Sequence, residues 1–300
     1  MTQQGKESIT PTVSIGMPVY NCEAFIREAI DSLLAQTFSE FELIISDNAS
    51  TDATEAICRE YAARDLRIRY IRQEANLGAA GNFKFVLDEA IGEYFMWAAG
   101  DDKCESKFLD RLLSVLKENK DIVLAMSDVK NISDCGSFID TSKLDNIRID
   151  AVKSDWNNIR PLFFENPTSQ VFFSIYGLFR TATLRHVSLN YFGLVRYASG
   201  SEIPLLAQIA IRGKVASIPD ELKIYRRHTA SVFSQEQKTF NAWMRLRNLF
   251  NIGNCLIRIA VRADLPVTEK LGLLATVIRT GSCRVFGFVL RRVFGLKLQI

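Results

Sequence analysis

A chain of 300 residues is long enough for one large α/β domain, or for a domain with an appendage. Its apolar fraction of 48% suits a globular protein, and no uncharged apolar run approaches the roughly 18–20 residues of a membrane-spanning helix. The formal charge of +3 is uneven: residues 241–300 hold ten Lys or Arg and two Asp or Glu, and the other 240 residues hold 27 and 32. The body is therefore mildly acidic and the tail strongly basic, which points to an anionic surface as a partner of the tail.

The six cysteines are scattered along the chain. They form no C-x-x-C pair, and no histidine lies beside them at the spacing of a zinc site. Together with the polar start MTQQGKESITPT, this pattern predicts a reduced, cytoplasmic protein.

The first 124 residues alternate between strand and helix patterns. Short apolar runs predict the strands, and apolar residues at helical spacing predict the helices between them. The expected strands cover residues 13–19, 41–46, 67–71 and 94–97, and the expected helices cover 23–36, 54–63, a segment that ends at 90, and 106–119. Alternation at this spacing favours an α/β fold with a mainly parallel sheet and right-handed crossovers.

Polar residues follow three of these strands, at Tyr20-Asn21, at residues 47–52 and at Asp101-Asp102. The carboxyl ends of parallel strands meet at one edge of a sheet, and ligands bind there. We therefore expect the three loops to converge into one site, with Tyr20 and Asn21 among the residues that contact the substrate. A single acid in such a loop is ordinary, because acids are common in turns and helix caps. The prediction of a site therefore rests on the expected convergence of the three loops.

The acids of these loops suit a nucleotide ligand. Asp47 is the first residue past an apolar strand, where it could accept hydrogen bonds from a base or ribose. The adjacent carboxylates of Asp101 and Asp102 suit a hard divalent cation shared with substrate phosphates. Neither G-x-G-x-x-G after the first strand nor G-x-x-x-x-G-K-[ST] is present, so a bound nucleotide must rely on a metal and side chains.

Four segments, VSIGMPVYN, SDNASTDAT, NLGAAGN and WAAGDD, resemble in order and spacing the nucleotide-sugar-binding half of family 2 glycosyltransferases, which are inverting enzymes of the GT-A fold. The resemblance covers about residues 12–232. It implies that Asp47 contacts the nucleobase and that Pro18, Tyr20 and Asn76 help to shape the nucleotide pocket.

The acidic motif of the family departs from its usual form here. The family often reads D-x-D-D where this chain has Ala99-Gly100-Asp101-Asp102, so the first acid is missing. The resemblance implies that Asp101 and Asp102 hold the ribose and a divalent metal, Mn²⁺ or Mg²⁺. We expect Asp102 to bind the metal and Asp101 to bind the ribose or a metal-bound water, and the assignment between the two stays open.

The elements expected in the second half are shorter and less regular. We expect a strand at 122–126, an acceptor-side insertion over 131–170 with short helices around Trp156 and 162–164, a strand or strand pair at 170–179, a helix from 181 to 185, and strands at 215–218 and 222–225.

Three residues of the second half are expected at the site. Glu202 precedes an amphipathic helix, where a carboxylate is also favoured by the helix dipole. The resemblance implies that an acid at this point is the general base. His228 lies beside Arg226 in a cluster suited to a diphosphate. The resemblance implies that this element closes over the donor, with His228 near the metal.

The sequence divides into a catalytic domain at 1–236, with a nucleotide-sugar-binding half at 12–128 and an acceptor-side half at 129–236, and a basic amphipathic helical tail at 237–300. Pro266 separates two helical segments of the tail. A basic amphipathic helix commonly lies in a membrane interface, here the inner face of the cytoplasmic membrane. Packing of its apolar face on the catalytic domain, or on another copy, is the competing interpretation.

The sequence thus predicts a metal-dependent inverting hexosyltransferase. It would move a sugar from a nucleoside diphosphate to a hydroxyl of a glycan or lipid-linked acceptor, in surface polysaccharide or lipopolysaccharide biosynthesis, with no nucleic acid as partner. A glycoside hydrolase is one alternative, but it would need two acids that face each other across a bond, not adjacent acids at a metal. A catalytically silent nucleotide-sugar-binding or membrane-adaptor protein is the other alternative, and the missing first acid supports it.

Overall fold

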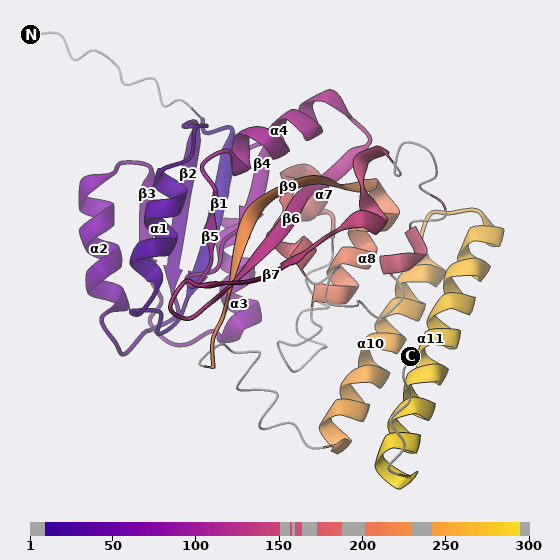
Figure 1. Ribbon diagram of the computed structural model, residues 1–300. Helices are drawn as coiled ribbons and strands as arrows, with labels where there is room; N and C mark the ends of the chain where they lie inside the picture. Colours follow the sequence, from indigo (N-terminus) through magenta and orange to yellow (C-terminus); the bar gives the residue numbers. More distant parts are fainter. Residues whose placement is uncertain are drawn as a thin grey trace, which may run out of the picture.

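The computed structural model describes residues 10–150, 157, 160–163, 173–187, 202–229 and 242–294 (Figure 1). The strands are β1 (Val13–Val19), β2 (Phe41–Asp47), β3 (Ile68–Arg72), β4 (Tyr94–Trp97), β5 (Lys103–Cys104), β6 (Ile122–Ser133), β7 (Phe138–Ser142), β8 (Leu178–Arg180) and β9 (Lys214–Arg227). The α-helices are α1 (Ile26–Leu34), α2 (Thr54–Arg64), α3 (Gly78–Asp88), α4 (Phe108–Glu118), α7 (Thr181–Arg185), α8 (Glu202–Arg212), α10 (Ala242–Arg262) and α11 (Val267–Phe294).

The strands form one mixed, mainly parallel sheet with helices packed around it (Figure 1). Its order is β3-β2-β1-β4-β8-β6-β9-β5, with β7 paired to β6. The pairs β1–β2, β1–β4, β2–β3 and β6–β9 are parallel, whereas β8 runs antiparallel to both β4 and β6. The predicted α/β fold is confirmed. Since β2, β1 and β4 are parallel neighbours, the loops that follow them lie at one edge, here called the rim.

The central strands are buried on both faces, which explains their unbroken apolar runs. A Cβ at Gly16 would lie 2.7 Å from Val86 Cγ2, so glycine lets α3 approach β1 closely. Pro18 is tolerated inside a strand for a different reason. The pairing of β1 with β4 ends at Gly16↔Trp97, so the N–H that Pro18 lacks would have had no partner on that side.

Two expected elements of the second half differ in the structure. Residues 173–176 form a 3₁₀ helix where a strand was predicted, and only β8 follows it. A Cβ at Gly177 would lie 2.6 Å from the main-chain oxygen of Ala125, and such a tight approach is not visible in an apolar pattern. The two strands predicted at 215–218 and 222–225 are one long β9 with register shifts.

The insertion after β6 was predicted only in outline. β7 forms a hairpin with β6 that the polar sequence did not reveal. The 3₁₀ helix Arg160–Phe163 lies near the short helix expected at 162–164, whereas the helix expected around Trp156 lies outside the described residues.

The basic tail consists of α10 and α11, which lie side by side and are separated at Pro266 as expected (Figure 1). α10 packs against α8, and α11 contacts the 3₁₀ helix at 160–163, where Arg160 forms an ion pair with Glu269. The buried face of α10, with Leu256 and Ile259, belongs to the same hydrophobic core as the sheet. One face of the tail therefore packs on the α/β domain. Within the described residues, the structure has no helix with the length and apolar character to span a bilayer.

This shared core predicts that the inward face of α10 stabilises the whole fold. Ile259→Ala should lower the free energy of unfolding by about 2–5 kcal/mol, because the lost methyl groups leave a cavity. Val261→Ala, at a position 54% exposed on the same helix, should change it by less than about 0.5 kcal/mol. Urea unfolding followed by circular dichroism measures both. Equal effects of the two substitutions would show that α10 is not part of the core.

Candidate active site

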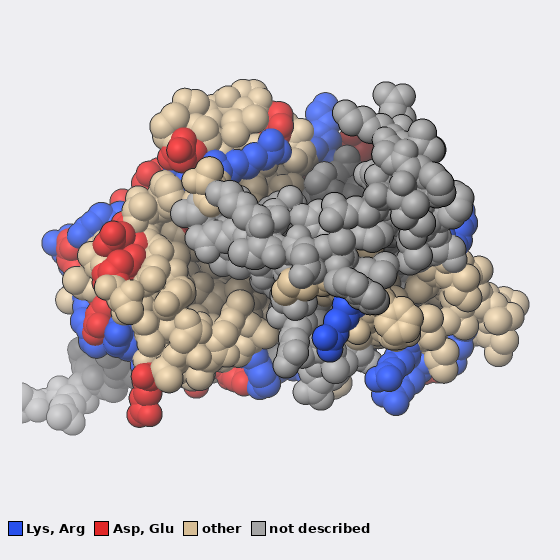
Figure 2. Space-filling view, turned by 90° about the horizontal axis from the view of Figure 1, so that it is seen from below, with Lys and Arg blue, Asp and Glu red and all other residues tan. Residues whose placement is uncertain are grey.

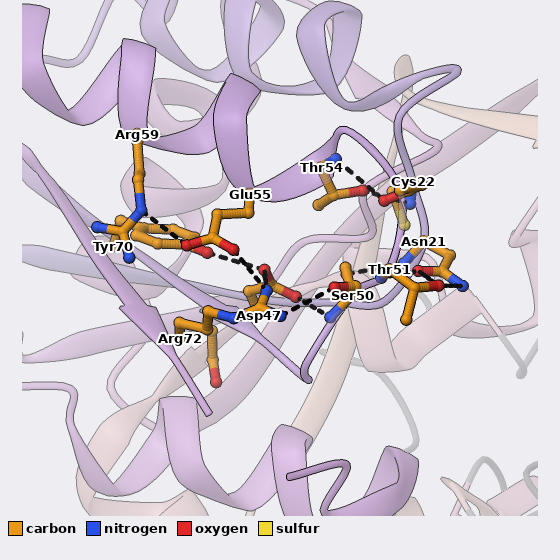
Figure 3. Close-up of polar contacts among 12 residues, drawn as sticks. Asn21, Cys22, Asp47, Ser50, Thr51, Thr54, Glu55, Arg59, Tyr70 and Arg72 are labelled. Carbon is orange, nitrogen blue, oxygen red and sulfur yellow. Dashed lines mark hydrogen bonds and ion pairs between the residues drawn. The ribbon is translucent and has the colours of Figure 1, made fainter. Parts of the chain in front are cut away.

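The loops after β1 and β2 are hydrogen-bonded to each other (Figure 3). The main-chain N–H of Asn21 donates to Ser50 Oγ at 3.0 Å, and the side-chain oxygen of Asn21 accepts from the N–H of Thr51 at 2.8 Å. The N–H of Cys22 donates to Thr54 Oγ1 at 2.8 Å. Asn21 has a φ of 51°, a left-handed conformation that asparagine adopts more readily than most residues. The expected convergence of these two loops is confirmed.

Asp47 ends β2 and is completely buried. Its carboxylate accepts hydrogen bonds from the N–H of Ser50 at 2.9 Å, the hydroxyl of Tyr70 at 2.8 Å and the guanidinium of Arg72 at 2.9 Å (Figure 3). Arg72 also pairs with Glu55 at 3.0 Å and keeps about a third of its side chain exposed. Burial and the hydrogen bond to Asp47 raise the pKa of Tyr70, so it stays a donor. Asp47 thus orients a partly exposed cation at the rim.

Sequence reasoning did not single out Tyr70 or Arg72. A signal was present, because Arg72 is the cross-strand neighbour of Asp47 in the parallel register of β2 and β3. In the sequence, however, Arg72 is one of many arginines, and its place beside Asp47 becomes visible only once the register is known.

Asn76 lies at the same rim, where it is hydrogen-bonded to Asn48, the residue after Asp47. The side-chain amide of Asn48 donates to Asn76 Oδ1 at 2.9 Å, and the N–H of Gly78 donates to the same oxygen at 2.8 Å. These bonds fix the loop that enters α3. Tyr20, 47% exposed, lies at the end of β1, so its ring is accessible to a ligand.

The acidic loop after β4 meets the first loop at Cys22. A Cβ at Gly100 would lie 3.1 Å from Cys22 Sγ, so the two loops are in close contact there. Burial raises the pKa of Cys22 to about 12, and the charges of Asp101, Asp52 and Asp47 act in the same direction. Acids of the second and third predicted loops therefore act on a thiol beside the first loop, and the close contact at Gly100 shows that the loops converge.

Asp101 faces His228, which follows β9. Its Oδ2 lies 2.8 Å from His228 Nε2, and the imidazole ring packs on Phe25 with the ring centroids 4.9 Å apart. The side chain of Asp101 is 29% exposed, so one edge of this pair is open to a ligand.

Asp102 points the other way, into the protein. It is almost completely buried, with Oδ2 3.1 Å from the ammonium of Lys223 and Oδ1 accepting the main-chain N–H of Arg226 at 3.0 Å. Burial raises the pKa of Asp102 to about 6, and the charge of Lys223 opposes that rise. Burial is the largest influence on Lys223 and acts to lower its pKa, but the charges of Asp102, Cys104 and Asp101 and the hydrogen bond to Asp102 together raise the pKa. Asp102 thus ties the acidic loop to β9.

Arg226 is placed differently from the expectation that it meets a diphosphate. Its guanidinium donates to the main-chain oxygens of Asp101 at 3.1 Å and Asp134 at 2.7 Å, and to the carboxylate of Glu28 at 2.9 Å. It also lies over the ring of Phe25, 4.6 Å from the centroid, and its side chain is only 1% exposed. A guanidinium that protein acceptors hold on several sides has no accessible face for a phosphate, so Arg226 positions the loops instead.

Glu202 begins α8 and is buried, and Tyr176 connects it with the acidic loop. Burial raises the pKa of Tyr176 well above its usual value, and the charges of Asp102, Asp101 and Glu202 add to that effect. The charges of all three carboxyl groups therefore act on one phenol, and α8 contacts the 3₁₀ helix that carries it. The ammonium of Lys223 lies over the same ring, 4.9 Å from its centroid.

The described residues contain no group of three or more His, Cys, Asp and Glu side chains that could hold a metal ion. Asp101 and His228 nevertheless fit a cation that takes its other ligands from phosphates and water, as Mg²⁺ commonly does. Neighbouring ligands of an octahedral ion with bonds of about 2.1 Å lie about 3 Å apart, close to the 2.8 Å observed between Oδ2 and Nε2.

The sheet order and the acids at the rim define a GT-A glycosyltransferase fold. A family model described as glycosyl transferase family 2 matches residues 14–186. The chain belongs to this family.

Several relatives share the sequence. The uncharacterized glycosyltransferase EpsJ of Bacillus subtilis is 29% identical over 222 residues, or 74% of this chain and 63% of EpsJ. The putative glycosyltransferase EpsE of the same organism is 36% identical over 111 residues, or 37% of this chain and 40% of EpsE. An uncharacterized glycosyltransferase of Haemophilus influenzae is 27% identical over 275 residues, or 88% of this chain and 80% of the relative. The matches to EpsJ and EpsE thus span less than two thirds of those proteins.

Solved structures share the fold at low identity. TarS 1–349 of S. aureus in complex with UDP-GlcNAc has a TM-score of 0.70 at 19% identity, with 96% of this chain and 77% of TarS covered. The mannosyltransferase PcManGT of Pyrobaculum calidifontis, in complex with GDP-Man and Mn²⁺, has a TM-score of 0.59 at 14% identity, with 97% and 77% covered.

The buried pair of Lys223 and Asp102 gives a test of the site's construction. Lys223→Met should lower the free energy of unfolding by about 3–5 kcal/mol, because it leaves a buried carboxylate without its cation. Adding Asp102→Asn should recover most of this loss, since the amide oxygen still accepts from Arg226 and no charge remains.

The matched control for this cycle is Lys103→Met, which removes an exposed pair with Glu28 and should cost less than about 1 kcal/mol. Urea unfolding of the unchanged chain, Lys223→Met, Asp102→Asn and the double variant closes the cycle. Additive costs for the two buried substitutions would mean that Asp102 and Lys223 do not depend on each other.

Proposed function

We propose that this chain is an inverting glycosyltransferase that moves a sugar from a nucleoside-diphosphate sugar to a hydroxyl of a glycan or lipid-linked acceptor. The observation that supports the proposal is a set of three different groups: the Asp47 network, the Asp101–His228 pair, and the buried Glu202, whose charge acts on the same phenol as Asp101. A one-step displacement needs a group for each of its three tasks, which are to hold the nucleotide, neutralise the leaving diphosphate and accept the proton.

In this proposal the nucleoside lies at the end of β2. Arg72, which the buried Asp47 orients, provides a donor for the base, and Pro18, Tyr20, Asn21 and Asn76 border the nucleotide. The solved structures with the same fold carry UDP-GlcNAc, UDP or GDP-Man, which supports a nucleoside-diphosphate sugar as the donor class.

The cation, Mn²⁺ or Mg²⁺, is proposed to be held by Asp101 and His228. The sequence points to Asp102 for this role, but the burial of Asp102 and its ion pair with Lys223 favour Asp101. Mn²⁺ in the PcManGT structure supports the choice of ion. When bound, the ion supplies positive charge to the diphosphate. In the D-x-D-D motif, Asp101 occupies the third position and is the proposed metal ligand. Asp102 occupies the fourth position and has a structural role.

Glu202 is proposed to be the general base. Its carboxylate takes the proton of the acceptor hydroxyl as the oxygen bonds to the anomeric carbon. The bond from that carbon to the diphosphate oxygen breaks in the same step, and the leaving group departs with the electron pair. Attack from the side opposite the diphosphate inverts the configuration at the anomeric carbon. Burial of Glu202 beside the acidic loop supports this role.

We place the reaction in the cytoplasm, in surface polysaccharide or lipopolysaccharide biosynthesis. The five cysteines described, Cys22, Cys58, Cys104, Cys135 and Cys255, are all free thiols, which suits a reducing compartment. Nucleic acid has no role in this proposal.

A catalytically silent nucleotide-sugar-binding or membrane-adaptor protein is the second candidate, and the missing first acid at Ala99 favours it. Incubation with radiolabelled nucleotide sugars and extracted lipid or glycan acceptors separates the two. Transfer of label supports the enzyme, and donor binding without transfer to any acceptor supports the silent protein.

Substitution of the proposed base predicts a loss of turnover without a loss of donor affinity. Glu202→Gln should lower kcat by about 10²-fold or more, because general-base catalysis contributes that much, while the Kd of the donor stays unchanged. Glu118→Gln, at an exposed position at the end of α4, is the matched control and should leave both constants alone. Unchanged turnover in Glu202→Gln would remove the assignment.

The Mn²⁺ dependence of activity tests which acid holds the cation. EDTA should abolish transfer, and added Mn²⁺ should restore it. Asp101→Asn and His228→Ala should each raise the Mn²⁺ concentration for half-maximal activity by at least about tenfold, because each removes a ligand. Asp102→Asn should raise it less than Asp101→Asn, since Asp102 acts through the loop. The reverse order would return the metal to Asp102.

A further inference from the structure

The face of the tail that points away from the catalytic domain has its own pattern. On α11, three large apolar side chains stand in solvent at helical spacing: Val267 is 70%, Leu271 is 59% and Ile278 is 60% exposed. Steps of four and seven residues place them on one side of the helix, opposite the buried Leu273 and Val277. This set of Val267, Leu271 and Ile278 is called the apolar ridge. Exposed apolar surface of this kind marks a contact site.

α10 contributes two arginines, a phenylalanine and a valine to the exposed face. Arg247, Phe250, Arg258 and Val261 are exposed and follow one another in steps of three, eight and three residues, which keeps them on one side of the helix. In the described part of the chain, no ion pair engages Arg247 or Arg258.

Acids are scarce around this surface. Residues 241–300 hold two, Asp264 and Glu269, and Glu269 is paired with Arg160. Residues 281–300 add four Lys or Arg to the sequence and no acid. In the view from below, the right-hand end of the molecule, over α10 and α11, shows Lys and Arg (blue) with few Asp or Glu (red). The left-hand end shows both kinds of charge (Figure 2).

We propose that the outward face of the α10–α11 pair is a docking surface for an anionic lipid bilayer. The apolar ridge and Phe250 enter the boundary between headgroups and acyl chains, and the arginines beside them meet the lipid phosphates, as in helices that lie flat in an interface. A second copy of this chain fits less well, because pairing two such faces would bring their arginines together without acids to balance them.

The proposal deepens the proposed function by naming where the acceptor lies. α10 contacts α8, whose first residue is Glu202, so the lipid surface would hold the catalytic domain on its Glu202 side. An acceptor carried on a lipid would then reach the site from the membrane. Docking itself does not depend on catalysis, and its test reads vesicle binding alone.

The experiment is co-sedimentation of the full chain with vesicles of phosphatidylglycerol and phosphatidylcholine, compared with vesicles of phosphatidylcholine alone. The chain should pellet with the anionic vesicles and be released by added salt. Arg247→Gln with Arg258→Gln should weaken binding about 25-fold, at about fivefold for each arginine. Leu271→Glu with Ile278→Glu should weaken it at least about tenfold, because it places charge in the apolar boundary.

Leu66→Glu is the matched control, since Leu66 is an exposed leucine, at 89%, outside the tail. It should bind as the unchanged chain does. All variants should keep the thermal midpoint and the affinity for nucleotide sugar, so a failure of docking is read separately from a failure of the transferase. Equal pelleting with both kinds of vesicle, or an equal loss in Leu66→Glu, would overturn the proposal. So would a dimer in sedimentation equilibrium that Leu271→Glu dissociates while vesicles stay unbound.

Discussion

The site depends on one buried ion pair, between Asp102 in the loop after β4 and Lys223 on β9. These residues are 121 positions apart, and the main-chain N–H of Arg226 adds a second bond to the same carboxylate. Taking both charges out of water costs several kcal/mol, so a pair of this kind contributes little net stability. What it supplies is orientation. With Asp102 held inward, the preceding residue, Asp101, turns outward toward His228, and two adjacent carboxylates have two separate roles.

Arg226 extends this constraint to three segments of the chain. One guanidinium reaches the main chain of the acidic loop, the turn between β6 and β7, and Glu28 on α1. Its own N–H meets Asp102, and the residue two positions later is His228. The end of β9 is thus fixed against the rim from several sides before any ligand arrives. A fixed arrangement lets the open edge of Asp101 and His228 meet a ligand without first reorganising the loops.

The first half of the fold could be predicted from sequence because its local patterns agree with its tertiary structure. The strands buried on both faces read as apolar runs, the helices between them as stripes, and the carboxyl ends of parallel strands meet at one edge whatever the register. The roles of Asp101 and Asp102 could not be separated that way, because side-chain direction in a turn has no period. It is set by Lys223, which arrives from a distant strand. Arg226 reads as a phosphate ligand in sequence, since nothing local reveals that Glu28 and two carbonyls already hold it.

The tail shows how one amphipathic pattern can contain two faces. Its sequence left open whether the apolar stripes pack on the catalytic domain or meet a membrane, as if one had to exclude the other. In the structure Leu256 and Ile259 are buried in the shared core. Val267, Leu271 and Ile278 remain exposed, so the tail has apolar residues beyond those that the core buries. The inward contact falls on α8, the helix that begins with Glu202. The proposed docking surface therefore lies on a helix that packs against α8, the helix that carries the proposed base.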